Sequence, residues 1–285
     1  MKKKMGFVVL CVVLLFGGCA SVSKKSGGTD NGEKTAFIER QLVSLEQIVK
    51  LHKEIKDIDR SLEKLGPVAV IENGVYFLFD LDESGEKYEF KMEYPYDGGD
   101  AKGIRAAYDL SFYGNRLAAV ISEEAFETAD GQAQIFHEFV HCFQFSEGSW
   151  DLKMTLAAAR EAWEKRDYMW DLNHPFPYTD ENFINKTGEL DNGYDIEKYH
   201  SEIKAELSEK DFEYMMWQEW NEGYARYIEN LVRERFGLPK IRNSLTPPLE
   251  RVVFYEIGSR YIETLIRNDP GLKGDIKTLF QKMVN

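Results

Sequence analysis

The sequence has few or none of several features that each indicate a class of protein. Only three of its 285 residues are cysteines, and lysine and arginine (36) are outnumbered by aspartate and glutamate (49), giving a formal net charge of −13. An acidic chain is a poor partner for nucleic acid, and we exclude that class. No apolar run reaches the length of about 18 residues that a membrane-spanning helix requires. There are also no internal repeats.

The N-terminus has the organisation of a secretory signal. Lys2, Lys3 and Lys4 precede an apolar run over residues 5–16, which two glycines and Cys19 follow. The run is too short to span a bilayer. The small pair before the cysteine resembles the lipobox of bacterial lipoproteins. This resemblance implies that residues 1–18 are a signal peptide, that Cys19 carries a lipid, and that the protein is exported and anchored to the membrane at the bacterial cell envelope.

Removal of this leader changes the properties of the remaining chain. It would leave 267 residues, enough for one large domain or two small ones, and would take the net charge from −13 to −16. Cys11 leaves with the leader and Cys19 would be lipidated, so only Cys142 remains and no disulfide can form within the chain. Stability must then come from burial, for which 18 Phe, 15 Tyr and 5 Trp are available.

Two segments precede the main part of the chain. Residues 19–34 are small, polar and glycine-rich, which predicts a flexible tether. Over residues 35–66, apolar residues recur in alternating steps of three and four, which predicts a long amphipathic helix that ends at Gly66 and Pro67. We expect this helix to pack on its own domain, because the heptad pattern needed for a dimeric coiled coil is interrupted.

Residues 67–285 are expected to form one domain with two parts. Five short β-branched or aromatic segments over 68–121 alternate with turn signals, which predicts a small, mainly antiparallel sheet. The pattern over 122–285 is helical, apart from a long aromatic and polar loop at 172–194. The predicted fold class is therefore α+β.

The stretch IFHEFVHCFQF (135–145) contains candidate metal-binding and catalytic residues. Polar side chains inside an apolar run cost free energy unless something compensates them. His137 and His141 are four residues apart, which on a helix places both imidazoles on one face. Two nitrogens at this spacing can bind one zinc ion while Glu138 activates the metal-bound water. The sequence thus predicts one zinc ion per chain.

A hydrolytic zinc site needs a third protein ligand and one open position. The segment WQEWNEGYARYIEN (217–230) supplies Glu222. Gly223 and Ala225 would let this helix approach the motif helix closely, as a chelating carboxylate requires. Glu229, two turns further on the same face, is placed to hold a ligand histidine through a hydrogen bond.

These motifs resemble those of a known family. HEFVH followed by NEGYA is similar to the gluzincin metallopeptidases, most of all to their aminopeptidase N and leukotriene hydrolase branch. The segment FYEIGSRYIETL (254–265) resembles the Tyr-Glu-x-Gly helix start of that branch. The resemblance covers about residues 130–265 and implies a zincin-like catalytic domain. The site residues that it implies are the zinc ligands His137, His141 and Glu222, the general base Glu138, and the oxyanion donor Tyr255.

The sequence departs from that branch in two ways. Its ligands are further apart in the chain, so an inserted helix and the loop around Pro175 and Pro177 must bulge outward. The Gly-x-Met-Glu-Asn strand, which binds a substrate's free amino terminus, is missing, so an endopeptidase or another hydrolase is as consistent as an aminopeptidase. Glu161, twenty residues after His141, has the spacing of thermolysin-like enzymes and competes with Glu222, although it lacks the Asn-Glu-Gly context.

Together these features predict a zinc-dependent hydrolase, most simply a metallopeptidase acting on peptide or protein substrates. The strand at 116–122 would be the edge strand that pairs with an extended substrate, as in the related families.

His174 and His200 are expected to be solvated. Two alternatives stay open: an inactive zincin-like lipoprotein that binds peptide or an envelope polymer, and a structural envelope protein in which the motifs are accidental.

Overall fold

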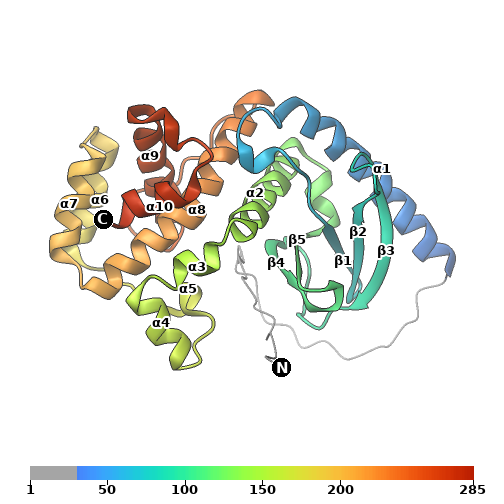
Figure 1. Cartoon of the computed structure of the whole chain (residues 1–285), viewed down its shortest axis with the longest axis horizontal. Coiled ribbons are helices and arrows are strands. Elements are labelled where there is room, and N and C mark those ends of the chain that lie inside the picture. Colours follow the sequence, from blue (N-terminus) through green and yellow to red (C-terminus); the bar gives the residue numbers. More distant parts are fainter. Residues whose placement is uncertain (1–30) are drawn as a thin grey trace. The chain divides into compact units, whose positions relative to one another are not determined.

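A computed structural model describes residues 31–285 (Figure 1). The predicted signal peptide, Cys19 and most of the predicted tether lie outside these residues. The fold is α+β, as predicted, with helices and a five-stranded sheet. The described chain forms two compact units: residues 31–57 with 62–142, and residues 58–61 with 143–285. The boundary between the two units falls between residues 142 and 143, inside the motif helix. The single domain expected over 67–285 stays a prediction.

The first unit contains a mixed sheet. Its strands are β1 (Val68–Glu72), β2 (Val75–Leu81), β3 (Tyr88–Pro95), β4 (Arg105–Leu110) and β5 (Arg116–Ser122). Their order is β3-β2-β1-β5-β4, and every neighbouring pair is antiparallel except β1 with β5. The expectation that the strand at 116–122 lies at an edge is wrong, because β5 lies between β1 and β4. A two-residue turn can order neighbouring strands locally, but the parallel β1–β5 pair is a long-range contact that the strand pattern does not encode.

The two faces of the sheet are covered differently. On one face, helix α1 (Asn31–Ile55) packs against β2, with the Phe37 and Phe77 ring centroids 4.6 Å apart. The other face carries a cluster formed by strand residues: Ala69, Ile71, Leu78, Ala106, Tyr108, Leu110, Ala118 and Val120. Partly buried aromatic side chains, among them Tyr76 and Phe112, pack over this cluster.

Helix α1 differs from the predicted helix at both ends. It begins at Asn31, inside the predicted tether, and ends at Ile55 instead of residue 66. The chain then forms the short 3-10 helix η1 (Arg60–Leu62). The buried Asp59 carboxylate accepts hydrogen bonds from Ser61 N (2.8 Å) and Tyr224 Oη (2.7 Å), which fixes a turn where periodicity alone continues the helix. Among residues 31–285, no helix is both long and apolar enough to cross a membrane.

Short connections lead from the sheet to the motif helix. The 3-10 helix η2 (Ser111–Tyr113) joins β4 to β5, and η3 (Glu123–Phe126) joins β5 to helix α2 (Ala129–Ser146). Helix α2 begins where Thr128 Oγ1 accepts a hydrogen bond from Gly131 N at 3.0 Å, the usual role of an N-terminal cap. The motif helix therefore has a defined start one short turn after the sheet.

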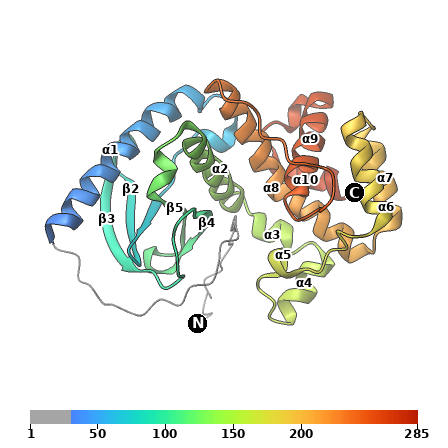
Figure 2. The same cartoon turned by 180° about the vertical axis from the view of Figure 1, so that it is seen from behind.

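The second unit is helical (Figure 2). Its α-helices are α3 (Ser149–Lys153), α4 (Ala157–Glu164), α5 (Trp170–Asn173), α6 (Glu181–Glu189), α7 (Ile196–Glu206), α8 (Glu209–Arg235), α9 (Val253–Asn268) and α10 (Ile276–Val284). Two further 3-10 helices are η4 (Leu190–Asn192) and η5 (Pro270–Leu272). The long loop predicted over 172–194 contains helix α6, which Asp180 caps by accepting a hydrogen bond from Phe183 N.

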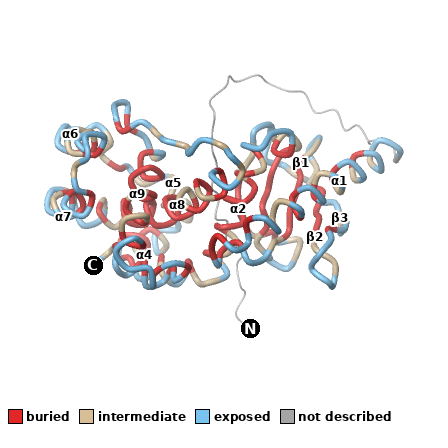
Figure 3. Tube along the Cα trace, turned by 90° about the horizontal axis from the view of Figure 1, so that it is seen from above, coloured by how far each residue is buried: buried red, intermediate tan, exposed pale blue. Residues whose placement is uncertain are grey.

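Helix α8 is the core of this unit. It buries residues around most of its circumference, including Trp220 and Tyr224 (Figure 3), as expected of a helix packed on several sides. Ser208 caps its start by accepting a hydrogen bond from Asp211 N, and Gly237, with a φ of 71°, follows its end. This end agrees with the sequence, where a glycine and a nearby proline close the helix.

Candidate metal centre

The motif helix α2 is held by its apolar residues. Ile135, Phe136, Phe139 and Val140 are buried, so the hydrophobic stretch around the motif forms a core face, as its composition indicates. The polar trio lies in the same helix and is also buried, with exposed fractions of 7% for His137, 3% for Glu138 and 3% for His141. Three buried polar side chains within five residues require a compensating interaction.

The two histidines face one another one helical turn apart. Their Nε2 atoms are 3.1 Å apart, and their rings meet edge to face at 4.8 Å between centroids. Two nitrogens bound to a tetrahedral zinc ion at about 2.0–2.1 Å lie about 3.3 Å from one another. The separation in the structure is close to that value, so the pair fits one zinc ion with little rearrangement.

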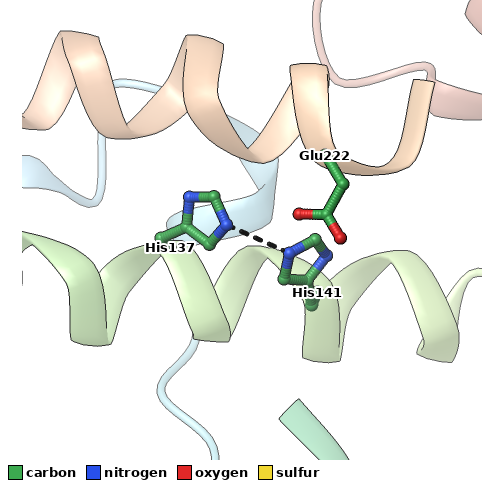
Figure 4. A group of neighbouring side chains, drawn as sticks. All are labelled: His137, His141 and Glu222. Carbon is green, nitrogen blue, oxygen red and sulfur yellow. Dashed lines mark hydrogen bonds between the residues drawn. The ribbon is translucent and has the colours of Figure 1, made fainter. Parts of the chain in front are cut away.

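Glu222 completes a group that could hold a metal ion. It is 1% exposed. His137, His141 and Glu222 each offer one ligand atom, and these atoms all lie within 4.8 Å of one another. In Figure 4 the Glu222 carboxylate points toward the imidazoles. Two imidazoles and a carboxylate are a ligand set found in catalytic zinc sites, where water or substrate takes the fourth position.

Glu222 has a cationic neighbour on its own unit. Arg251 Nη1 lies 3.3 Å from Glu222 Oε1, and it lies 3.5 Å from Gln218 Oε1. The predicted oxyanion donor Tyr255 is 4% exposed, and the Arg251 guanidinium carbon lies 5.8 Å from its ring centroid. Arg226 approaches the Tyr255 ring at 5.4 Å. Glu222 and Tyr255 thus both lie against Arg251, whose charge is paired with the Glu222 carboxylate.

The glycines of the second and third motifs contact one another. A Cβ atom on Gly223 would lie 2.6 Å from Gly258 Cα, a distance at which the backbone must shift. Gly223 follows Glu222 in α8, and Gly258 lies three residues after Tyr255 in α9. The tight contact that Gly223 permits is therefore with α9. This contact fixes the segment that carries Glu222 relative to the segment that carries Tyr255.

The other two candidate carboxylates have different surroundings. Glu229 is buried (1% exposed), and its Oε2 lies 3.1 Å from Arg226 Nε; its contact with a ligand histidine stays a prediction. Glu161 is partly exposed and pairs with Lys165 and Lys210, each at 2.5 Å, and these lysines lower its pKa to about 2. Among the described residues, the metal-capable group contains Glu222 and not Glu161.

The expectation that His174 and His200 are solvated is wrong. His174 Nε2 lies 2.7 Å from Asp211 Oδ1, and its ring stacks on Tyr214. His200 is buried, with its Nε2 2.6 Å from Glu219 Oε2. Both partners are distant in sequence, so local polarity misled the prediction.

One charged neighbour of the motif could not be predicted from the sequence. Arg105, the first residue of β4, interacts electrostatically with Glu138 and with Glu124, and its burial lowers its pKa. Nothing in the local pattern of a strand start distinguishes this arginine from a surface residue. Only the pairing of β4 beside β5, which leads into α2, reveals it.

Comparisons of the chain with protein-family models, with curated proteins and with solved structures gave no match.

Proposed function

We propose that this protein is a zinc-dependent hydrolase, most simply a peptidase of gluzincin type. The observation that carries the proposal is the buried group of His137, His141 and Glu222, whose donor chemistry suits a catalytic zinc ion. The neighbouring Glu138 supplies the general base that such a site needs. The Asn-Glu-Gly and Tyr-Glu-x-Gly motifs, whose glycines touch, support the same assignment.

The roles of the side chains follow from their chemistry. A zinc ion bound there would polarise a substrate carbonyl and acidify a water molecule. Glu138 takes a proton from the attacking water and delivers it to the leaving amine. Tyr255 donates a hydrogen bond to the oxyanion that develops on the carbonyl oxygen. The two arginines beside Tyr255 are each paired with a glutamate, Arg226 with Glu229 and Arg251 with Glu222.

The substrate would lie along the edge of the sheet. Of the two edge strands, β3 and β4, we assign the substrate to β4, because β4 pairs with β5, the strand that leads to helix α2. Unpaired backbone groups at such an edge bind an extended chain by strand addition. We further propose that the protein acts at the bacterial cell envelope, exported by its N-terminal signal and held to the membrane by a lipid on Cys19.

The test separates catalysis from metal binding. Zinc-loaded protein from residue 24 onward is screened against a peptide library, beside Glu138→Gln. We expect Glu138→Gln to keep its zinc and to lose about 10²–10⁴-fold in kcat, the usual contribution of a general base. Glu127→Gln, an exposed glutamate just before α2, is the matched control and should cleave normally.

Two results would contradict the proposal. Cleavage by Glu138→Gln at the wild-type rate would show that Glu138 is not the base. A zinc-loaded wild type that binds peptides but cleaves none of them would instead identify an inactive, peptide-binding protein.

A further inference from the structure

Arg105 lies at the start of the edge strand that we assign to the substrate. β4 pairs with β5 and, among the described strands, with no other. One side of its backbone therefore offers N–H and C=O groups to an extended chain. A side chain at the start of this strand is well placed to contact a residue of a peptide bound there.

The Arg105 side chain is on the same face of the sheet as the proposed general base. Ala106 and Tyr108 belong to the cluster on one face, and side chains alternate along a strand, so Arg105 projects from the other face. On that face its guanidinium interacts with the carboxylates of Glu138 and Glu124. The charges of Arg105 and Glu138 thus act on one another, although the two residues are distant in sequence.

The hydrogen bonds of Arg105 use one part of the guanidinium. Nη1 donates to Ile104 O at 2.5 Å and to Ser122 Oγ at 2.9 Å. Nε is buried and has no hydrogen-bond partner. A buried donor without a partner costs about 1–3 kcal/mol. Since Nη1 makes both of these hydrogen bonds, Nε and Nη2 are the donors left for a further acceptor.

We propose that Arg105 is a substrate-binding residue that recognises a carboxylate of the bound peptide. This inference rests on the proposed function and names its substrate class. The Nε and Nη2 edge of a guanidinium matches the two oxygens of a carboxylate in a bidentate pair, which a lysine cannot reproduce. The carboxylate belongs either to an acidic side chain or to the C-terminus of the peptide.

The test compares matched peptides that differ only in charge. A peptide cleaved by the wild type is made with Glu or Gln beside the scissile bond, and with a C-terminal acid or amide. We expect kcat/KM to favour one carboxylate version by about tenfold or more, the effect of a hydrogen bond to a charged group. The pair that shows the preference identifies the source of the carboxylate.

Three variants test whether Arg105 causes the carboxylate preference. Arg105→Gln should abolish the preference, whatever its rate on the neutral peptide, and should keep its zinc. Arg105→Lys keeps the charge but not the bidentate geometry of the guanidinium, so it should retain part of the carboxylate preference. It replaces Arg105→Gln in the test if that variant does not fold. Arg40→Gln removes an exposed arginine of the same unit and should leave the preference intact.

A binding measurement distinguishes this inference from the proposed function. Calorimetry with zinc-loaded Glu138→Gln and the same peptides reports recognition without turnover. Tighter binding of a carboxylate version, lost with Arg105→Gln, supports the inference even if the wild type cleaves nothing, in which case only the proposed function fails. Equal affinity for charged and neutral peptides, no binding of either, or a preference unchanged by Arg105→Gln would overturn it.

Discussion

Glu219 in helix α8 is a buried carboxylic acid. Burial disfavours its charged form unless a nearby group compensates the charge. Glu219 is 0% exposed, and its Oε2 lies 2.6 Å from His200 Nε2. His200 Nδ1 lies 2.7 Å from Ile196 O, which can only accept, so Nδ1 carries a hydrogen. A hydrogen bond between Nε2 and the Glu219 carboxylate then requires one further proton between these two groups.

Burial sets the direction of the Glu219 titration. It raises the pKa of Glu219 above 4.5, while the charge and hydrogen bond of His200 oppose the shift. Tyr199 and Tyr261 also interact electrostatically with Glu219. A raised folded-state pKa contributes stability that is present below the unfolded pKa and is lost as the pH rises through the folded pKa.

We predict that Glu219→Gln removes this pH dependence. The free energy of unfolding of wild type relative to Glu219→Gln should fall as the pH rises above the unfolded pKa of Glu219. All five tryptophans (Trp150, Trp163, Trp170, Trp217 and Trp220) lie in the second unit, so urea unfolding followed by tryptophan fluorescence reports that unit. Glu234→Gln, an exposed site on the same helix, is the control. A constant difference between wild type and Glu219→Gln from about pH 4 to pH 8 would contradict the prediction.

For individual residues, the sequence predicts which side chains share one face of a helix, and it predicts few contacts between separate segments. The positions of His137 and His141 on one face follow from a spacing of four residues, and the structure places their Nε2 atoms 3.1 Å apart. Glu222 could be proposed only from its motif context. The partners of Arg105, His174 and His200 come from other segments, so no local pattern could reveal them.

Among the elements, the α8–α9 pair depends on two glycines. Gly223 and Gly258 meet where a Cβ on Gly223 would lie 2.6 Å from Gly258 Cα. A glycine inside a helix costs about 1 kcal/mol relative to alanine, so a compensating gain is expected, and the close backbone approach provides it. The same contact joins the segments of Glu222 and Tyr255.

We predict that Gly223→Ala lowers the free energy of unfolding of the second unit by about 1–3 kcal/mol, because overpacking at a backbone contact strains both helices. The same tryptophan-detected unfolding measures it. Gly188→Ala, in helix α6 with nothing within 4 Å of its Cβ position, is the matched control and should be stabilised by up to about 1 kcal/mol. Equal effects of the two substitutions would show that the α8–α9 contact is not tight.

Helices and strands were predicted well where a local pattern defines them. They were predicted poorly where contacts with distant residues determine their ends or their neighbours. The segments of the sheet follow from their β-branched and aromatic residues. The end of α1 does not follow from its periodicity, because the Asp59 turn depends on Tyr224. The placement of β4 at the edge depends on the long-range β1–β5 pair.

For the whole molecule, the central claim is that one metal ion organises three ligands from distant parts of the chain. His137 and Glu222 are separated by more than eighty positions. A ligand that binds only the folded protein stabilises it, by about 2.7 kcal/mol at a concentration of one hundred times Kd. The zinc ion would therefore contribute to stability as well as to catalysis.

The zinc content of the purified protein from residue 24 onward tests this claim most directly, measured beside Glu222→Ala and Glu161→Ala, with tryptophan fluorescence to confirm folding. The account predicts one zinc ion per chain in the wild type and in Glu161→Ala, and its loss in folded Glu222→Ala. Absence of zinc from the wild type, or its retention at full stoichiometry in Glu222→Ala, would contradict the account.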